Sequence, residues 1–243
     1  MAQLVLPRQK LQSRDEFFLD PNLVLYLPLY KLDGASFVSR DHYGHLATAF
    51  GAVWTPQGRR WDAAGDDYIN TDSALPSLVT TTKGTWMAWV KLDDATPATY
   101  HIAISFGDTD ALEHILLGIF QTTGLLYAQV YDAGVKPWGL QTDAAALSDG
   151  NYAHIALIQN GTAPILLVNG VQVAQTFTAE TDKTAWFSVC TGLDNGRIGC
   201  INNNSGGNTN YTRNGNVREV ILSNRNYSIP EVQNYIQATK WRY

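Results

Sequence analysis

The sequence is poor in cysteine and in long apolar runs. Cys190 and Cys200 are the only cysteines among 243 residues, too few for a disulfide scaffold. No run approaches the ~20 apolar residues that a membrane-spanning helix needs. The first apolar run is broken after three residues by Pro7, which makes it too short for the core of a secretory signal. These absences argue against membrane insertion and predict a soluble protein without an export signal of its own.

Charge of either sign is also scarce. Charged residues make up 16% of the chain, and the formal net charge is -5. The sequence has no basic cluster interleaved with aromatic residues, so it lacks the electrostatic footprint of a nucleic-acid-binding protein. We therefore expect no nucleic-acid partner.

Asn, Thr, Gly, Tyr and Trp are plentiful instead, and this balance favours strands and turns. From residue 22 onward, short apolar runs alternate with turn residues. Asn-Gly pairs at positions 160, 169, 195 and 214 favour hairpins because both residues tolerate positive φ. Many short strands with frequent turns indicate a β-sandwich or barrel, here one domain of residues 22–243. Residues 1–21 show no sustained period and are expected to form an N-terminal docking arm.

Two segments give more specific predictions. The run 85–92 alternates so that Trp86 and Trp89 lie on opposite faces, which predicts a strand covered on both sides. Near the end of the chain, Ser228 and Glu231 have the spacing of a capping box, and apolar residues follow at helical spacing. A short C-terminal helix is expected there.

The spacing of the two cysteines leaves their state open. If residues 193–197 form a tight turn, Cys190 and Cys200 lie opposite each other across a hairpin, because the centre of the turn is midway between them. A disulfide is then geometrically allowed, while a reduced pair fits the missing secretion signal. Both alternatives stand at this point.

Six segments occur in an order typical of one known group of sandwich proteins. They are residues 25–33 with 40–44, residues 58–62 with 66–69, residues 86–91, residues 149–175, residues 197–199 with 215–222, and the serine-capped helix. Together they resemble the concanavalin A-like lectin/glucanase superfamily, in particular its laminin-G-like jelly-roll domains, over about residues 22–240. The resemblance implies an all-β fold, a two-sheet antiparallel jelly-roll sandwich with a short C-terminal helix.

His154 stands alone in a long apolar run. It is in phase with Tyr152, Ala156 and Ile158, so its side chain is expected to point toward an apolar surface. A catalytic histidine needs a nucleophile or an orienting carboxylate nearby, and the sequence supplies neither. The resemblance implies a framework residue in a central strand, whose ring we expect to hydrogen-bond to the backbone or to a hydroxyl.

Glycosidases on the resembled fold carry two acids spaced two residues apart on one strand, so that both face the cleft. The chain has five glutamates, and none has such an acidic neighbour on a convincing strand. Asp108 and Asp110 have the spacing, but they follow Gly107 at the end of a strand and indicate a turn. We therefore predict no catalytic residues and a protein that is not an enzyme. A divergent polysaccharide hydrolase or lyase is the enzymatic alternative.

Calcium is the metal that the sequence leaves open. Many members of the resembled superfamily hold it, and hard oxygen ligands are abundant here. In related domains an Asp often precedes the Glu-Val of the penultimate strand, where this chain has Arg218. We expect its guanidinium to replace the charge of the cation by pairing with Asp41 or Asp66. The prediction is therefore no cofactor and no metal ligands, with calcium as the exception to test.

Glycan binding on a sandwich needs an aromatic platform flanked by amides and hydroxyls, since sugar rings have apolar faces and polar edges. The candidate ligand-binding residues are Tyr127, Tyr131 and Trp138 along one strand and loop, and Trp186 and Tyr211 beside the asparagine-rich loop 202–210. The alternative is that most of these rings fill the core or an oligomer interface.

The opening segment, residues 23–36, is similar to laminin-G-type proteins encoded in phage genomes. This similarity implies a non-catalytic virion surface component, such as a decoration, fibre or tail protein, with host glycans as an optional ligand. Its expected partners are copies of itself in a symmetric homo-oligomer and other virion proteins, and its expected location is the phage particle. A free carbohydrate-binding lectin is the alternative.

Overall fold

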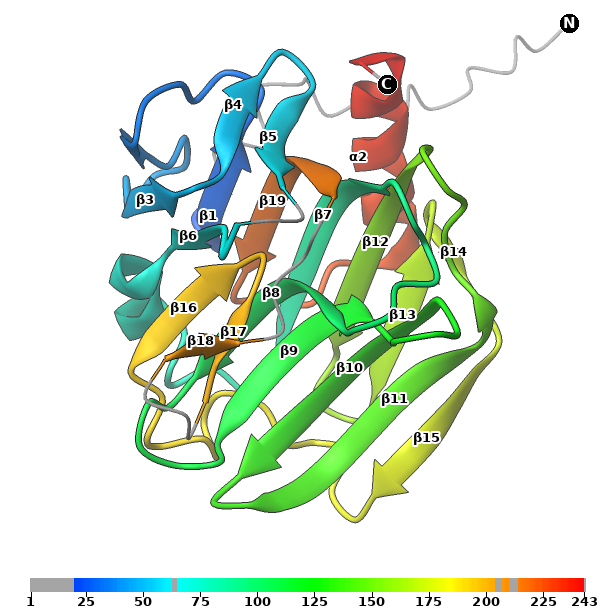
Figure 1. The fold of residues 1–243 in the computed structure, drawn as a ribbon. Helices are drawn as coiled ribbons and strands as arrows, with labels where there is room; N and C mark the ends of the chain where they lie inside the picture. Colours follow the sequence, from blue (N-terminus) through cyan, green and yellow to red (C-terminus); the bar gives the residue numbers. More distant parts are fainter. Residues whose placement is uncertain (1–19, 63–64, 204–206, 210–213, 243) are drawn as a thin grey trace, which may run out of the picture.

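The computed structural model describes residues 20–62, 65–203, 207–209 and 214–242. Two antiparallel sheets lie face to face with the main apolar core between them (Figure 1). This arrangement confirms the predicted all-β sandwich. The predicted arm, residues 1–21, lies outside the described residues except for its last two, so its role stays a prediction. Within the described part, no helix is both long and apolar enough to span a bilayer.

The first sheet has eight strands. Seven of them follow the order β14 (Val171–Gln172), β13 (Pro164–Val168), β12 (Tyr152–Gln159), β7 (Gly84–Leu92), β19 (Gly215–Ser223), β5 (Gly58–Trp61) and β4 (Val53–Thr55), while β1 (Leu23–Pro28) pairs with β19. Strand β7 is covered on both faces. Trp86 of β7 lies in the core between the sheets, and Trp89 lies on the opposite face. The prediction of a strand buried on both sides is confirmed.

The second sheet has nine strands and supplies the other wall of the core. Its order is β15 (Gln175–Glu180), β11 (Val135–Ala145), β10 (Leu125–Asp132), β9 (His114–Ile119), β8 (His101–Gly107), β16 (Asn195–Ile198), β6 (Tyr68–Asn70), β3 (Leu46–Phe50) and β2 (Ser36–Val38). A small third sheet pairs β17 (Ile201–Asn202) with β18 (Asn208–Thr209). The short 3-10 helix η1 (Asp72–Ser77) follows β6.

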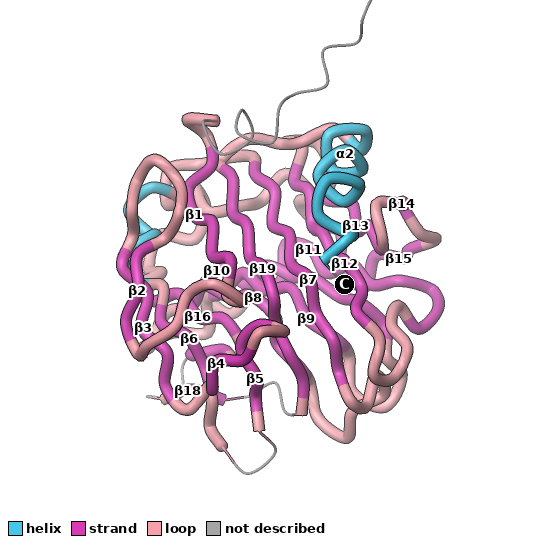
Figure 2. Tube along the Cα trace, turned by 90° about the horizontal axis from the view of Figure 1, so that it is seen from above, coloured by secondary structure: helices cyan, strands magenta, loops and turns pink. Residues whose placement is uncertain are grey.

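Helix α2 (Ile229–Thr239) covers the eight-stranded sheet on the side away from the core, and the 3-10 turn η2 (Lys240–Arg242) follows it (Figure 2). The side chain of Ser228 accepts from the Glu231 N–H, and the Glu231 carboxylate accepts from the Ser228 N–H at 2.8 Å, so the predicted capping box is confirmed. Val232, Tyr235 and Ile236 are the buried apolar contacts of the helix with the sheet.

The Asn-Gly pairs do not all form turns: one pair described here forms a hairpin turn, and another lies within a strand. Asn169 and Gly170 connect β13 to β14 with φ of 52° and 78°, the positive values that a tight hairpin turn requires. Asn195 and Gly196 instead belong to β16, because their backbone pairs with β8, so the predicted turn over 193–197 is wrong. With no hairpin to bring them together, Cys190 and Cys200 are both free and buried, and burial raises the pKa of both thiols.

Candidate functional site

The face of the nine-stranded sheet that points away from the core, called here the outer face, carries a row of polar side chains. The register places six residues side by side across six strands: Thr48, Asn70, Arg197, Ser105, Leu116 and Gln129. Their neighbours along each strand, such as Ile69 and Ile198, point into the core. Strand alternation therefore concentrates hydrogen-bonding groups on the outer face, where Thr48, Asn70 and Gln129 are partly exposed and Arg197, Ser105 and Leu116 are buried.

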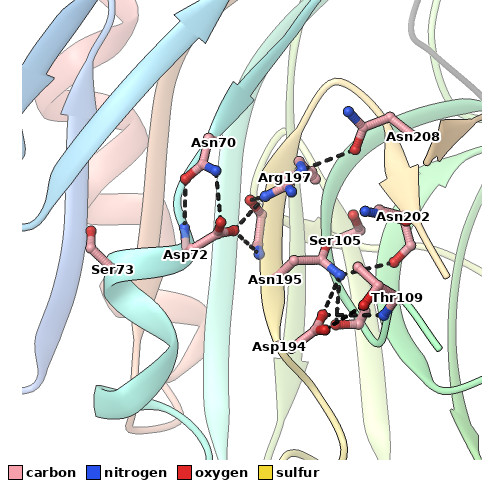
Figure 3. Close-up of polar contacts among 12 residues, drawn as sticks. Asn70, Asp72, Ser73, Ser105, Thr109, Asp194, Asn195, Arg197, Asn202 and Asn208 are labelled. Atoms are coloured by element: carbon pink, nitrogen blue, oxygen red, sulfur yellow. Dashed lines mark hydrogen bonds and ion pairs between the residues drawn. The ribbon is translucent and has the colours of Figure 1, made fainter. Parts of the chain in front are cut away.

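Arg197 organises one end of this row, together with Asp72, Asn70 and Asn208; these four residues are called the Arg197 cluster (Figure 3). The Nη1 of Arg197 forms an ion pair with Oδ1 of Asp72, and its Nε donates to Oδ1 of Asn208 at 3.0 Å. Asp72 also accepts from the Nδ2 of Asn70 at 2.7 Å. The cluster joins β6, η1, β16 and β18, and the Arg197–Asp72 pair has no net charge.

Two aromatic rings extend this cluster toward the edge of the sheet. Phe50 of β3 and Tyr68 of β6 stack with their centroids 4.7 Å apart and their planes 13° from parallel. The guanidinium of Arg197 lies 5.5 Å from the centre of the Tyr68 ring, and Phe50 is 45% exposed. A solvent-exposed aromatic ring can stack on the apolar face of a sugar. The neighbouring amides and guanidinium can hydrogen-bond the hydroxyl groups at its edge.

The β17–β18 hairpin lies across the middle of the outer face and is held to the sheet by polar contacts (Figure 3). Ser105 donates to the carbonyl of Cys200 at 2.8 Å, and the Nδ2 of Asn195 donates to the carbonyl of Asn202 at 3.1 Å. A Cβ atom on Gly107 would lie 2.0 Å from the Asn202 oxygen, so only glycine allows this close approach. The hairpin therefore has a fixed position relative to β8.

On the far side of the hairpin, a second group of polar residues surrounds His114 of β9. The group consists of His114, Gln129, Asn203 and Tyr131 and is called the His114 cluster. The imidazole is 3% exposed, with its Nε2 3.0 Å from the Gln129 amide and its Nδ1 2.9 Å from the Asn203 amide. It stacks against Tyr131 with the ring centroids 4.8 Å apart. Burial, followed by the charge of Lys136, lowers the pKa of His114 to about 3.

The predicted ligand-binding aromatics have different locations in the structure. Tyr131 is half-buried on the outer face, and Tyr127 points to the same face but is only 6% exposed, packed with Ile102, Leu116 and Ile201. Tyr211 lies outside the described residues. Trp138 and Trp186 are in the core between the sheets.

The prediction for the two tryptophans therefore needs correction. Trp138 has no exposed surface, and its indole N–H donates to the carbonyl of Ala185 at 2.8 Å. Its ring stacks on Trp186, which is 1% exposed. Both rings fill the core, so neither is accessible to a ligand. The prediction missed two further rings on the outer face, the exposed Phe50 and the half-buried Tyr68, and no spacing along the chain marks them.

The structure agrees with the predictions that His154 is a framework residue in a strand and that Asp108 lies in a turn. His154 is completely buried in β12 beneath α2, but neither ring nitrogen has a hydrogen-bond partner among the described residues, so the expected hydrogen bond from the ring is wrong. Asp108 follows β8, and its Oδ1 accepts from the backbone N–H groups of Asp110 and Ala111 at 2.7 and 3.2 Å. Such bonds are those of a turn rather than of a catalytic acid pair.

The residues considered for calcium have other contacts. The Arg218 guanidinium lies 4.8 Å from the centre of the Tyr30 ring. Asp41 accepts from three backbone N–H groups, those of Tyr26, Tyr43 and Gly44, so its proposed pairing with Arg218 is wrong. Over the described ranges, no three His, Cys, Asp or Glu side chains are grouped to hold a metal ion. The pairing with Asp66 stays a prediction, and so does the expectation of no cofactor and no metal ligands, with calcium as the exception to test.

Two antiparallel sheets with a covering helix and a polar outer face define a jelly-roll domain of the lectin type. The family model described as the concanavalin A-like lectin/glucanases superfamily matches residues 63–233. The chain belongs to this superfamily. No curated protein matches it.

Solved structures with a similar fold include binding modules and enzymes. The CBM40 of the Ruminococcus gnavus IT-sialidase, bound to α2,3-sialyllactose, is 16% identical with a TM-score of 0.57, and the match covers 73% of this chain and 92% of that one. The Trypanosoma rangeli sialidase in complex with sialic acid is 14% identical with a TM-score of 0.61, covering 90% and 33%. The K499G mutant of the NanB sialidase from Streptococcus pneumoniae is 18% identical with a TM-score of 0.60, covering 72% and 27%.

The TM-scores of about 0.6 show a common fold, and the matches span about a quarter to a third of each sialidase chain. They also correct one prediction. Sialidases are among the proteins that share this fold, so the lack of two acids spaced two apart on a strand is no ground for calling the chain non-catalytic. The prediction that the protein is not an enzyme is therefore wrong.

Proposed function

We propose that the protein is a carbohydrate-binding lectin whose site is the outer face of the nine-stranded sheet. The observation that carries this proposal is the stack of the exposed Phe50 on the half-buried Tyr68, beside the Arg197 cluster. An aromatic ring binds the apolar face of a sugar, while amides, a guanidinium and a carboxylate bind its hydroxyl groups. The similar CBM40 structure with bound sialyllactose supports the proposal.

Sialylated oligosaccharides are the first ligands to test. Arg197 is 8% exposed and its charge is balanced by Asp72, so a sugar carboxylate would have to compete with Asp72 for the guanidinium N–H donors. Asp72 already shares this cation, so the pair can also hydrogen-bond a neutral sugar. Comparison of sialyllactose with its methyl ester, which removes the carboxylate charge and keeps the rest of the sugar, isolates the contribution of the carboxylate.

Replacement of Phe50 by alanine tests the platform. We expect Phe50→Ala to weaken sialyllactose binding about tenfold, because a stacking surface is lost. Since the ring is 45% exposed, the free energy of unfolding should change little. Isothermal titration calorimetry measures the affinity, and Val171→Ala, at a 59% exposed position on β14, is the matched control. Equal affinities for wild type and Phe50→Ala, or no signal from wild type on a glycan array, would reject the proposed site.

Hydrolysis of sialylated glycans is a second candidate function, favoured by the sialidases among the similar structures. Release of sialic acid from a fluorogenic sialoside at a rate proportional to protein concentration would support it. A rate equal to that of the buffer alone would reject it for this chain.

We also propose a location on a phage particle and assembly into a homo-oligomer through residues 1–21. The support is the similarity of residues 23–36 to phage-encoded laminin-G-type proteins. Light scattering of the full chain and of a chain lacking residues 1–21 compares their oligomer masses, and equal masses would contradict a role of the arm in assembly.

A further inference from the structure

A bulge in β11 directs the side chain of Lys136 to the outer face of the nine-stranded sheet. The register of β10 and β11 shifts between Val130 and Asp132, where β11 has one residue more than β10. Lys136 and Pro137 therefore both lie opposite a single residue of β10. Strict alternation from Trp138, which points into the core, would place Lys136 on the core side. The bulge removes this constraint.

Gly139 provides the space for the lysine side chain. It is the register partner of Gln129, so it lies on the outer face. A Cβ atom at position 139 would lie 3.1 Å from Cδ of Lys136 and 2.5 Å from Oγ1 of Thr178. Because glycine has no side chain, the aliphatic part of the lysine can lie along the strand. Its ammonium group is held 5.2 Å from the centre of the half-buried Tyr131 ring.

The charge of Lys136 has no counter-ion among the described residues. The ion pairs that these residues form do not include Lys136. On the same face, Arg197 is paired with Asp72 and is 8% exposed. An anionic ligand group that approaches Lys136 has no carboxylate to displace, whereas at Arg197 it competes with Asp72. Lys136 is therefore the better partner for an anion on the outer face.

We propose that Lys136 is the centre of a second glycan subsite, which binds the carboxylate of an acidic sugar. Thr178 is exposed and Gln129 is half-buried beside it, and their hydroxyl and amide groups can hydrogen-bond sugar hydroxyl groups. This inference rests on the proposed glycan-binding function and names the class of sugar that this part of the outer face selects.

The subsite is separate from the Phe50–Tyr68 stack. Five steps from strand to strand lie between β6 and β11, which is about 24 Å at ~4.8 Å per step. The β17–β18 hairpin lies across the outer face between them (Figure 3). A trisaccharide such as sialyllactose is too short to contact both. Each end of the face can therefore be tested independently in the same protein.

The test is a titration of 15N-labelled protein with the methyl glycoside of sialic acid and with the methyl ester of this glycoside, which lacks the charge. We expect the acid to shift the Gly139 and Gln129 amide signals saturably and to bind about tenfold more tightly than the ester. Lys136→Met should remove this preference. Lys183→Met is the matched control, because it removes the same charge from a lysine that also lies against an aromatic ring but already forms an ion pair.

Salt gives a second readout. The preference of wild type for the acid should fall as the ionic strength rises from about 20 mM to about 200 mM, and Lys136→Met should show no such dependence. A preference for the acid that survives in Lys136→Met, or equal affinities of wild type for acid and ester, would overturn the inference. An equal loss of preference in Lys183→Met would assign the effect to net charge and would overturn it as well.

The location of the shift changes separates this inference from the proposed function. Changes confined to Tyr68 and Asn70 would overturn the subsite and leave the proposed function standing. Shift changes at neither end of the outer face, with these sugars or with sialyllactose, would overturn the subsite and also contradict the proposed function.

Discussion

His154 shows what complete burial does to one ionisable side chain. Its ring lies 5.2 Å from the Trp89 ring and 5.8 Å from the Tyr235 ring, and neither nitrogen has a hydrogen-bond partner within the part of the chain that the structure describes. Burial lowers the pKa of His154 to about 3, from an ordinary value of 6.5. The folded protein therefore keeps this imidazole neutral, while the unfolded chain takes up a proton below pH 6.5.

This difference predicts a pH dependence of stability. As the pH falls from 6.5 toward 3, the His154 contribution should destabilise the fold by roughly 1.4 kcal/mol per pH unit. His154→Phe lacks this titration, so the gap in free energy of unfolding between wild type and variant should move in favour of the variant over that range. Urea denaturation at several pH values measures the gap. A gap that stays constant would show that His154 titrates alike in both states.

For single residues, the sequence predicts which side chains share a face of a strand, but it does not always predict which face meets the core. The alternation of β7 was enough to place Trp86 and Trp89 on opposite faces, because a strand has a period of two. Nothing in the alternation of β11 says which of its faces meets the core, so Trp138 was equally compatible with a ligand site and with the core. The order of the strands decides this question, and strand order is not a local property.

The C-terminal elements α2 and η2 are fastened to the eight-stranded sheet by a buried polar group. Glu219 of β19 is 1% exposed and accepts from Tyr235 of α2, and it forms an ion pair with Arg242 of η2. The hydroxyl of Tyr26 lies 3.5 Å from the same carboxylate. A buried carboxylate of this kind requires its cation, since an unpaired buried charge is strongly unfavourable.

Removal of the cation should therefore destabilise the fold. We expect Arg242→Met to lower the free energy of unfolding by about 3–5 kcal/mol, because the buried Glu219 carboxylate loses its ion-pair partner and keeps only its contacts with the Tyr235 and Tyr26 hydroxyls. The double variant Glu219→Gln with Arg242→Met removes both charges and should recover most of this loss. Guanidinium denaturation measures all three proteins. A single variant as stable as wild type would contradict a role of the ion pair in holding η2.

At the scale of helices, strands and turns, the features that the sequence predicts best are those that depend on residues close together in the chain. The capping box of α2 depends on Ser228 and Glu231, three positions apart, and its geometry follows from that spacing. Asn195 and Gly196 carry the same turn signal as Asn169 and Gly170, but the first pair is held in β16 by β8 and the second forms the turn. Pairing with a distant strand outweighed the local preference.

For the whole molecule, the order of segments along the chain was enough to indicate the sandwich, because apolar alternation and turn residues recur throughout. The candidate site was not predictable in the same way. Phe50, Tyr68 and Arg197 come from β3, β6 and β16, which become neighbours only through the order of the nine-stranded sheet. Their separation in sequence carries no signal, and a site of this kind becomes visible only once the register is known.

The central claim is that the outer face of the nine-stranded sheet binds a glycan. The most direct test is a titration of 15N-labelled protein with sialyllactose, followed by the backbone and side-chain amide shifts. We predict saturable shift changes at Tyr68, Asn70 and Arg197, and at Gln129 across the hairpin, with little change in α2. Shift changes that gather on α2 and the eight-stranded sheet, or none at saturating sugar, would contradict it.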